Sequence, residues 1–229
     1  MAETTKTTAQ ELDEVQAIKK AKDFWGRYSK PITYVGGAII LIAAAWIGYK
    51  NFVLAPKTKK ANEAITKAQA YFAADSLDLA LNGDGIAAGF LKVIKNYSGT
   101  DAANLAHYYA GAIYLRKEDY KNAIKHLEDF STDASQIQSA AWRMLGDAYL
   151  STDKKEKGAD LLAKAGKLND KDEVSSSENL FRAAMAYESI GKQEKAADLL
   201  KIIKEKYPKT EKGSVVDKYL ARLGVIIND

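Results

Sequence analysis

The chain has 229 residues, of which 47% are hydrophobic and 28% are charged, and its formal net charge is +4 at pH 7. The absence of cysteine excludes disulfides, thiol catalysis, zinc–thiolate sites and an anchor built on a lipidated cysteine. Acidic and basic residues are interspersed along residues 57–229, so a surface for binding nucleic acid or another polyanion is not expected.

The first thirty residues combine acidic, basic and aromatic side chains. In ELDEVQAIKKAKDFWGRYSK, residues 11–30, large apolar side chains gather near one helical face, and basic side chains line much of the rest. The apolar residues are Val15, Ile18, Trp25 and Tyr28, and the basic ones are Lys19, Lys20, Lys22 and Arg27. We predict that residues 1–30 are a tail containing an amphipathic helix that contacts anionic lipid. The alternative is a solvated helix that continues the next segment.

Nineteen consecutive uncharged residues separate Lys30 from Lys50. A charge at the bilayer centre costs about 2.5–3.5 kcal/mol, and about 20 apolar residues cross the hydrocarbon layer. The sequence therefore predicts a transmembrane helix over residues 31–54. A buried core helix would usually keep a polar face, and a signal peptide would normally lie at the chain start.

One face of this predicted transmembrane helix carries small residues, which let helix backbones approach each other in a membrane. We expect this stripe to contact a second transmembrane helix, although small residues are common in membrane spans anyway. The stripe comprises Gly37, Leu41, Ala44 and Gly48.

Residues 57–229 show apolar side chains at three- and four-residue steps, which indicates amphipathic helices. Small polar residues interrupt the pattern, mostly together with Gly or Pro, and Thr or Asp is well placed there to cap the following helix. The breaks lie at 82–85, 97–101, 131–135, 151–154, 168–172 and 207–213. We expect an all-α domain of eight or nine helices, each of about 12–24 residues.

A residue pattern recurs within this domain. Its best example is Trp142, Leu145, Gly146 and Tyr149, and the spacing returns 35 residues earlier around Gly111 and 38 residues later around Ala184. A Gly or Ala lets two helices approach closely, aromatic and Leu side chains fill the space beside it, and Pro ends the unit. The predicted repeat core is Gly111, Tyr114, Ala123, Trp142, Leu145, Gly146, Tyr149, Ala184, Tyr187, Ala196 and Pro208. The alternative is a helical bundle in which the spacing is a coincidence.

Few residues are suited to catalysis or to holding a cofactor. His107 and His126 are nineteen residues apart, a spacing that does not suggest a metal site. The segment GDGIAAG, residues 83–89, has one residue too many for a dinucleotide-binding loop, and no strand precedes it. We expect a non-enzymatic protein without a cofactor or metal.

The recurring residues resemble the tetratricopeptide repeat. The resemblance implies that an α-solenoid follows the predicted transmembrane helix, and that the first helix of each pair lines a concave face. The matching positions are Leu105, Tyr108, Ala112, Arg143, Asp147, Phe181, Met185 and Glu188. A mixed aromatic and polar groove suits an extended or unfolded segment, or a partner's helix. The alternative is that these residues only pack neighbouring helices.

A short tail, one span near the amino terminus and a tetratricopeptide-like domain resemble the YfgM-type family, ancillary subunits of the bacterial SecYEG translocon. The resemblance implies a single-pass inner-membrane protein with a cytoplasmic amino terminus and a periplasmic carboxyl domain. There are five basic residues before the span and four after it, a small excess that also favours a cytoplasmic amino terminus. The implied partners are the translocon and a membrane-anchored periplasmic chaperone, with emerging clients as a further candidate. The alternatives are a scaffold of another envelope complex and a holdase or regulator of unfolded chains.

Overall fold

The computed structural model describes residues 2–225, with the side chains of residues 15–225. The described residues are mostly helical, and their one β feature is an isolated bridge between Gly83 and Ala88. The prediction of an all-α chain is confirmed. The chain divides into two compact units, Met1–Pro56 and Lys57–Asp229.

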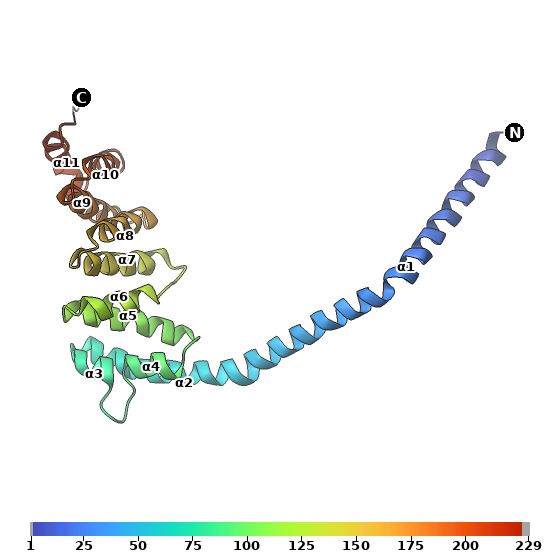
Figure 1. Ribbon diagram of the computed structural model, residues 1–229, viewed down its shortest axis with the longest axis horizontal. Coiled ribbons are helices and arrows are strands. Elements are labelled where there is room, and N and C mark those ends of the chain that lie inside the picture. Colours follow the sequence, from blue (N-terminus) through green and yellow to red (C-terminus); the bar gives the residue numbers. More distant parts are fainter. Residues whose placement is uncertain (1, 226–229) are drawn as a thin grey trace. The chain divides into compact units, whose positions relative to one another are not determined.

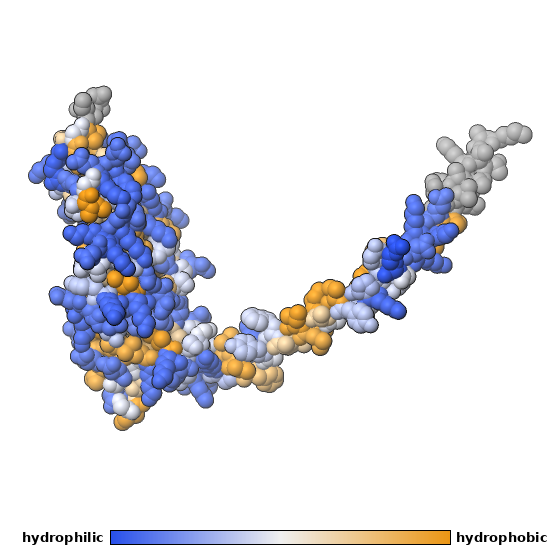
Figure 2. Space-filling model, in the orientation of Figure 1, coloured by the Kyte–Doolittle hydropathy of each residue, from blue (hydrophilic) through white to orange (hydrophobic). Residues whose placement is uncertain are grey.

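The first unit is helical along its described length. Helix α1 runs from Ala2 to Tyr49 and passes into a π-helical turn, η1, at Lys50–Leu54. Residues 2–30 are the first part of α1 and not a separate helix. Within the described part of the chain, one helix is long and apolar enough to cross a membrane, and its most apolar window is unburied; Figure 2 shows these apolar residues in orange. Membrane anchors and signal sequences share these properties.

The π-helical turn lies directly before Pro56. Proline has no backbone N–H, and its ring clashes with the carbonyl of the residue four positions earlier, here Phe52. The wider π turn accommodates the ring, and helix α2 continues from Ala55 to Ala73. The sequence predicts that the transmembrane helix ends at residue 54, but the helical backbone continues through Pro56.

The second unit contains α2 and nine further helices among the described residues. These are α3 (Leu77–Asn82), α4 (Phe90–Asn96), α5 (Asp101–Arg116), α6 (Tyr120–Glu128), α7 (Ser135–Leu150), α8 (Lys155–Leu168), α9 (Glu173–Ser189), α10 (Gln193–Lys206) and α11 (Glu211–Arg222). The predicted number of helices was too low. The predicted length of 12–24 residues holds for seven of these helices and is wrong for α3, α4 and α6, which have only six, seven and nine residues.

Three helix ends were missed by the sequence analysis. Asp75 after α2 and Glu118 after α5 have φ angles of 55° and 58°, a conformation that glycine usually takes at a helix end. The third end, after α9, does use a glycine, Gly191, with φ of 76°. The first two were missed because their turn residue is neither Gly nor Pro.

Several predicted caps are present. The side chains of Thr100, Asp172 and Thr210 each accept a hydrogen bond from the backbone N–H three residues further on, at the starts of α5, α9 and α11. Ala134 and Lys154 stand at the N-cap positions of α7 and α8 instead and form no side-chain cap. Asp119 caps α6 in the same way, so side-chain caps fix the starts of α5, α6, α9 and α11.

The helices from α5 onward stack as successive pairs, α5 with α6, α7 with α8 and α9 with α10, followed by α11 (Figure 1). Small residues lie where paired helices meet. Gly111 on α5 lies against Leu127 on α6, and Gly146 on α7 lies against Gly158 on α8. These close contacts seal the apolar core between the helices of each pair.

Most residues predicted for the repeat core are buried, namely Gly111, Ala123, Leu145, Gly146, Tyr149, Ala184, Tyr187 and Ala196. Tyr114 and Trp142 are only half-buried, and Pro208 is exposed. Trp142 lies at the edge of the core, where Nζ of Lys164 is 3.8 Å from its ring centre. Pro208 follows the last residue of α10 by two positions, so it ends the helix and does not fill the core.

Candidate partner-binding groove

The first helices of successive pairs lie side by side. Arg182 on α9 pairs with Asp147 on α7, and Arg222 on α11 pairs with Glu188 on α9. Helix α5 in turn contacts α7. Helices α5, α7 and α9, which carry the predicted groove residues, thus form one face that α11 continues.

The predicted groove residues differ in exposure. Arg143 is exposed, whereas most of the others are half-buried, namely Leu105, Tyr108, Asp147, Phe181, Met185 and Glu188. Ala112 is 9% exposed and belongs to a core cluster with Leu127 and Tyr149. Ala112 is therefore a packing residue and does not line a groove.

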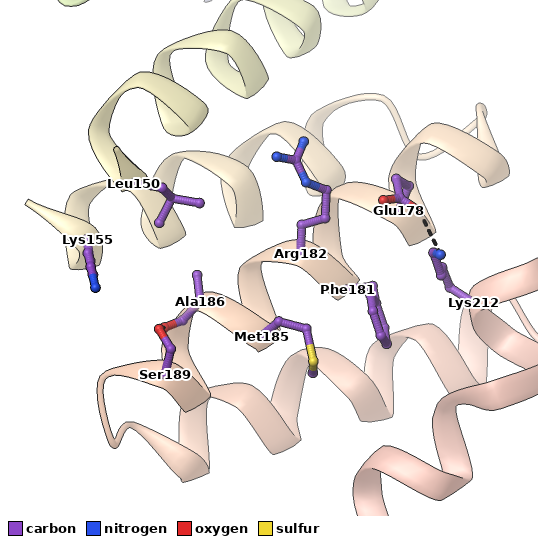
Figure 3. A pocket seen from close by; sticks show the side chains of 9 residues that line it. All are labelled: Leu150, Lys155, Glu178, Phe181, Arg182, Met185, Ala186, Ser189 and Lys212. Carbon is purple, nitrogen blue, oxygen red and sulfur yellow. Dashed lines mark hydrogen bonds and ion pairs between the residues drawn. The ribbon is translucent and has the colours of Figure 1, made fainter. Parts of the chain in front are cut away.

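A cleft of about 450 Å³ opens beside α9 (Figure 3). Phe181 and Met185 form its α9 wall, and the lining extends to Leu150 at the end of α7, Lys155 at the start of α8 and Lys212 in the first turn of α11. Only Phe181 and Met185 were among the predicted groove residues. Lys155 and Lys212 were missed because they stand in helix starts that the repeat pattern does not include.

Helix α11 holds one side of the cleft in place. The ring of Phe181 meets the ring of Tyr219 edge to face, with centroids 4.7 Å apart. Nζ of Lys212 is 5.3 Å from the centre of the Phe181 ring and 3.2 Å from Oε2 of Glu178, the contact drawn in Figure 3. Hydrogen bonds to Glu211 and Glu178 raise the pKa of Lys212, which keeps this amine charged.

Charges on this face form a chain between neighbouring helices. Asp147 accepts from both terminal nitrogens of Arg182 and lies 3.9 Å from Nη1 of Arg143. Five cationic side chains line the cleft or pair along this face, against four carboxylates. The cations are Arg143, Lys155, Arg182, Lys212 and Arg222, and the carboxylates are Asp147, Glu178, Glu188 and Glu211. The face is therefore apolar at its centre, with one more cation than carboxylate around it. The clue to Arg182 in the sequence is its distance of 35 residues from Asp147, about one repeat length.

Tyr108 on α5 is held by other rings. Its ring centroid is 5.2 Å from that of Phe130 and 5.7 Å from that of Tyr109. Burial raises the pKa of Tyr108, so its hydroxyl stays neutral near pH 7. At this end of the face, the predicted groove residue Tyr108 packs against neighbouring rings.

The predicted stripe on the apolar part of α1 lies on an open helix surface. A Cβ added at Gly37 or Gly48 would meet no heavy atom within 4 Å, and Leu41 is 72% exposed. Ala44 is exposed as well. The stripe remains a prediction about a second transmembrane helix.

The fold brings together two histidines that the sequence analysis treated separately. Nδ1 of His107 on α5 lies 3.2 Å from Nδ1 of His126 on α6, so one nitrogen donates and the other accepts. The His126 ring also stacks on the Tyr114 ring, with centroids 5.5 Å apart. The clue in the sequence is that both histidines lie nearly equally far from the turn at Lys117 and Glu118, so that antiparallel packing of α5 and α6 places them opposite each other.

Protonation of this histidine pair is disfavoured. Burial lowers the pKa of both rings, and for His126 the charge of His107 adds to the effect and brings the pKa to about 4. Asp129 opposes the shift, with Oδ2 at 3.7 Å from Nδ1 of His107. Among the described residues, no group of three His, Cys, Asp or Glu side chains is arranged to hold a metal ion.

Comparison with known families adds to this geometry. The model of the tetratricopeptide repeat matches residues 178–210, which cover most of α9, all of α10 and the turn at Pro208. A search of curated proteins gives no match to the chain. The stacked helix pairs are thus a tetratricopeptide-like repeat region, a class of architecture that supports interactions between proteins.

Proposed function

We propose that this protein is a non-enzymatic, membrane-anchored adaptor that binds a polypeptide partner along the face formed by α5, α7, α9 and α11. The observation that carries this proposal is the cleft beside α9, where Phe181 and Met185 form an apolar wall between cationic side chains. A groove with an apolar floor and basic borders suits an extended segment or a helix with apolar and acidic side chains.

In this proposal, residues 1–30 are a cytoplasmic tail and residues 31–54 are the membrane anchor. Residues 57–229 are the binding domain, on the periplasmic side of a bacterial inner membrane. The unburied apolar stretch of α1 supports the anchor, since about 20 such residues are needed to span the hydrocarbon core.

The proposed partners are the SecYEG translocon and a membrane-anchored periplasmic chaperone. The support is the combination of one apolar helix near the amino terminus with a tetratricopeptide-like domain, the arrangement that resembles the YfgM-type family. Emerging client proteins are a further candidate for the same face.

Arg143 offers the cleanest test of the groove. It is exposed, and its contact to Asp147 is long at 3.9 Å, so Arg143→Glu should alter the face with little effect on folding. We expect this variant to lose most of the translocon subunits and chaperone that co-purify with the full-length protein from gently solubilised membranes. Lys201→Glu, on the exposed surface of α10, makes the same charge change as a control.

Equal recovery of the partners with both variants would contradict a role for this face. Co-purification of a different envelope complex would instead make the protein a scaffold of that complex. Suppression of light scattering from unfolded substrates by the protein alone would indicate a holdase.

The stripe on α1 is proposed to contact a transmembrane helix of the partner. Gly37→Ile combined with Gly48→Ile should abolish co-purification and leave membrane insertion intact, because bulky side chains keep helices apart. Ile39→Leu with Ile42→Leu serves as the control on the same helix. Equal recovery with both double variants would show that the span is only an anchor.

A further inference from the structure

The part of α1 just before its apolar stretch is strongly basic. Between Val15 and Lys30 there are five basic residues and one acidic residue, Asp23. The basic residues are Lys19, Lys20, Lys22, Arg27 and Lys30. Four acidic residues, Glu3, Glu11, Asp13 and Glu14, come earlier in the chain with a single basic one, Lys6, so the positive charge is concentrated nearest to the predicted span.

The same segment has a continuous apolar face. At 3.6 residues per turn, all its apolar side chains except Val15 fall within an arc of about 120° that no charged residue from Val15 to Lys30 enters. The arc consists of Ala17, Ile18, Ala21, Phe24, Trp25 and Tyr28. Lys20 and Lys22 stand beyond its two borders, where long side chains can lay their methylene groups along an apolar surface and keep the charge in water.

This apolar face is open along α1. Ile18 and Phe24 are each 56% exposed, and Trp25 is 61% exposed. Phe24 and Tyr28, one helical turn apart, have ring centroids at 4.9 Å, so they form one aromatic surface. Apolar area of this size in water is unfavourable, and a covering surface would remove the cost.

Pro31 gives α1 a place to bend between this segment and the apolar stretch. It lacks the N–H that would donate to the carbonyl of Arg27, and its ring crowds that carbonyl. Nearby, the hydroxyl of Thr33 donates to the carbonyl of Ser29 at 2.8 Å, a side-chain hydrogen bond that often bends helices. The segment before Pro31 is therefore free to turn away from the axis of the helix that follows.

We propose that residues 15–28 lie along the membrane surface, with the apolar arc at the boundary of the acyl chains and the basic side chains among anionic lipid headgroups. This inference rests on the proposed membrane anchor, which would hold the segment at the surface. The charge ratio of five to one over residues 15–30 favours anionic lipid over a protein groove as the covering surface, because a lipid surface presents negative charge along the whole helix.

Tryptophan fluorescence of the full-length protein in lipid vesicles tests the proposal. Trp46→Phe with Trp142→Phe leaves Trp25 as the only reporter, and Trp25→Phe with Trp142→Phe leaves Trp46 as the reporter of the span. Vesicles of phosphatidylcholine are compared with vesicles in which phosphatidylglycerol replaces part of it. Each set carries lipids brominated either near the headgroup or at mid-chain.

We expect Trp25 to be quenched by the bromines near the headgroup in the anionic vesicles. Most of that quenching should be lost in phosphatidylcholine, at high salt, or in Lys20→Glu with Lys22→Glu. Lys201→Glu with Lys218→Glu, in exposed positions of the second unit, should leave it unchanged. Trp46 should be quenched in every case.

Absence of Trp25 quenching together with normal quenching of Trp46 would overturn the inference and leave the anchor standing. Trp25 would then be covered by protein or exposed to water. Absence of quenching for both reporters would overturn the anchor and this inference together.

Discussion

Gly146 and Gly158 bring α7 and α8 into backbone contact. A Cβ added at Gly146 would lie 3.0 Å from the carbonyl oxygen of Gly158, and a Cβ added at Gly158 would lie 2.8 Å from the carbonyl oxygen of Gly146. Leu162 and Leu150 close the remaining space beside the two glycines. Neither position can take a side chain unless the helices move apart.

We therefore expect Gly146→Leu and Gly158→Ala to destabilise the second unit by about 1–3 kcal/mol, the usual cost of overpacking a core. In an open helical position, glycine to alanine would instead stabilise the protein. Urea denaturation followed by near-UV circular dichroism measures the change, and Gln136→Ala on the exposed surface of α7 is the control. Unchanged stability of both glycine variants would argue against this helix contact.

Because Trp142 is only half-buried, its replacement by alanine should lower the stability of the fold less than the loss of a fully buried tryptophan would. A fully buried tryptophan replaced by alanine costs about 3–5 kcal/mol, but Trp142 is half-buried and covered on one face by Lys164. We expect Trp142→Ala to cost less than Leu162→Ala, because Leu162 is 0% exposed and would leave a closed cavity. The same denaturation experiment ranks the two variants, and the reverse order would place Trp142 in the core.

The pair of His107 and His126 predicts a dependence of stability on pH. Both pKa values are lowered in the folded protein, that of His126 to about 4, so the unfolded chain binds more protons below its histidine pKa of about 6.5. The contribution of the neutral pair to the free energy of unfolding is present above about pH 6.5 and is lost as the pH falls towards 4. We expect a loss on the order of 1 kcal/mol in the free energy of unfolding between about pH 7 and pH 5.

His126→Phe removes the titrating ring and keeps an aromatic group against Tyr114, so this loss should become smaller. Carboxylates with lowered pKa values, such as Asp84 at about 2, lose their contribution at more acidic pH and do not mask the effect. An equal pH dependence in the variant and the parent protein would remove the histidine pair as its cause.

Carbonate extraction tests the membrane anchor. Full-length protein should stay in the pellet with the membranes, because the apolar stretch of α1 is long enough to cross the bilayer. A variant without residues 1–56 should be extracted and remain helical, since the second unit has its own hydrophobic clusters. Release of most of the full-length protein would show that α1 does not span the membrane.

Local patterns in the sequence predicted much of this fold. The spacing of Gly146 and Tyr149 identified a close contact between helices because backbone proximity demands a particular residue type. The ends of helices at Asp75 and Glu118 were not predictable, because residues other than glycine take the left-handed conformation there.

Only part of the candidate site could be predicted from the sequence. Phe181 and Met185 were found through the repeat register, whereas Lys212 enters the cleft from a helix outside the matched repeats. The contact of Phe181 with Tyr219 depends on how α11 packs on α9, which local periodicity does not encode. The contact of His107 with His126 was not predicted either, because it depends on how α6 packs on α5.

Site-specific photocrosslinking in intact membranes tests the central claim most directly. A photoreactive residue replaces Arg143 on the proposed binding face or Lys201 on the exposed surface of α10, in otherwise unchanged full-length protein. We predict that the Arg143 position yields a discrete adduct with a translocon subunit or the membrane-anchored chaperone, and that the Lys201 position does not. No adduct from Arg143, or the same adduct from both positions, would contradict binding along this face.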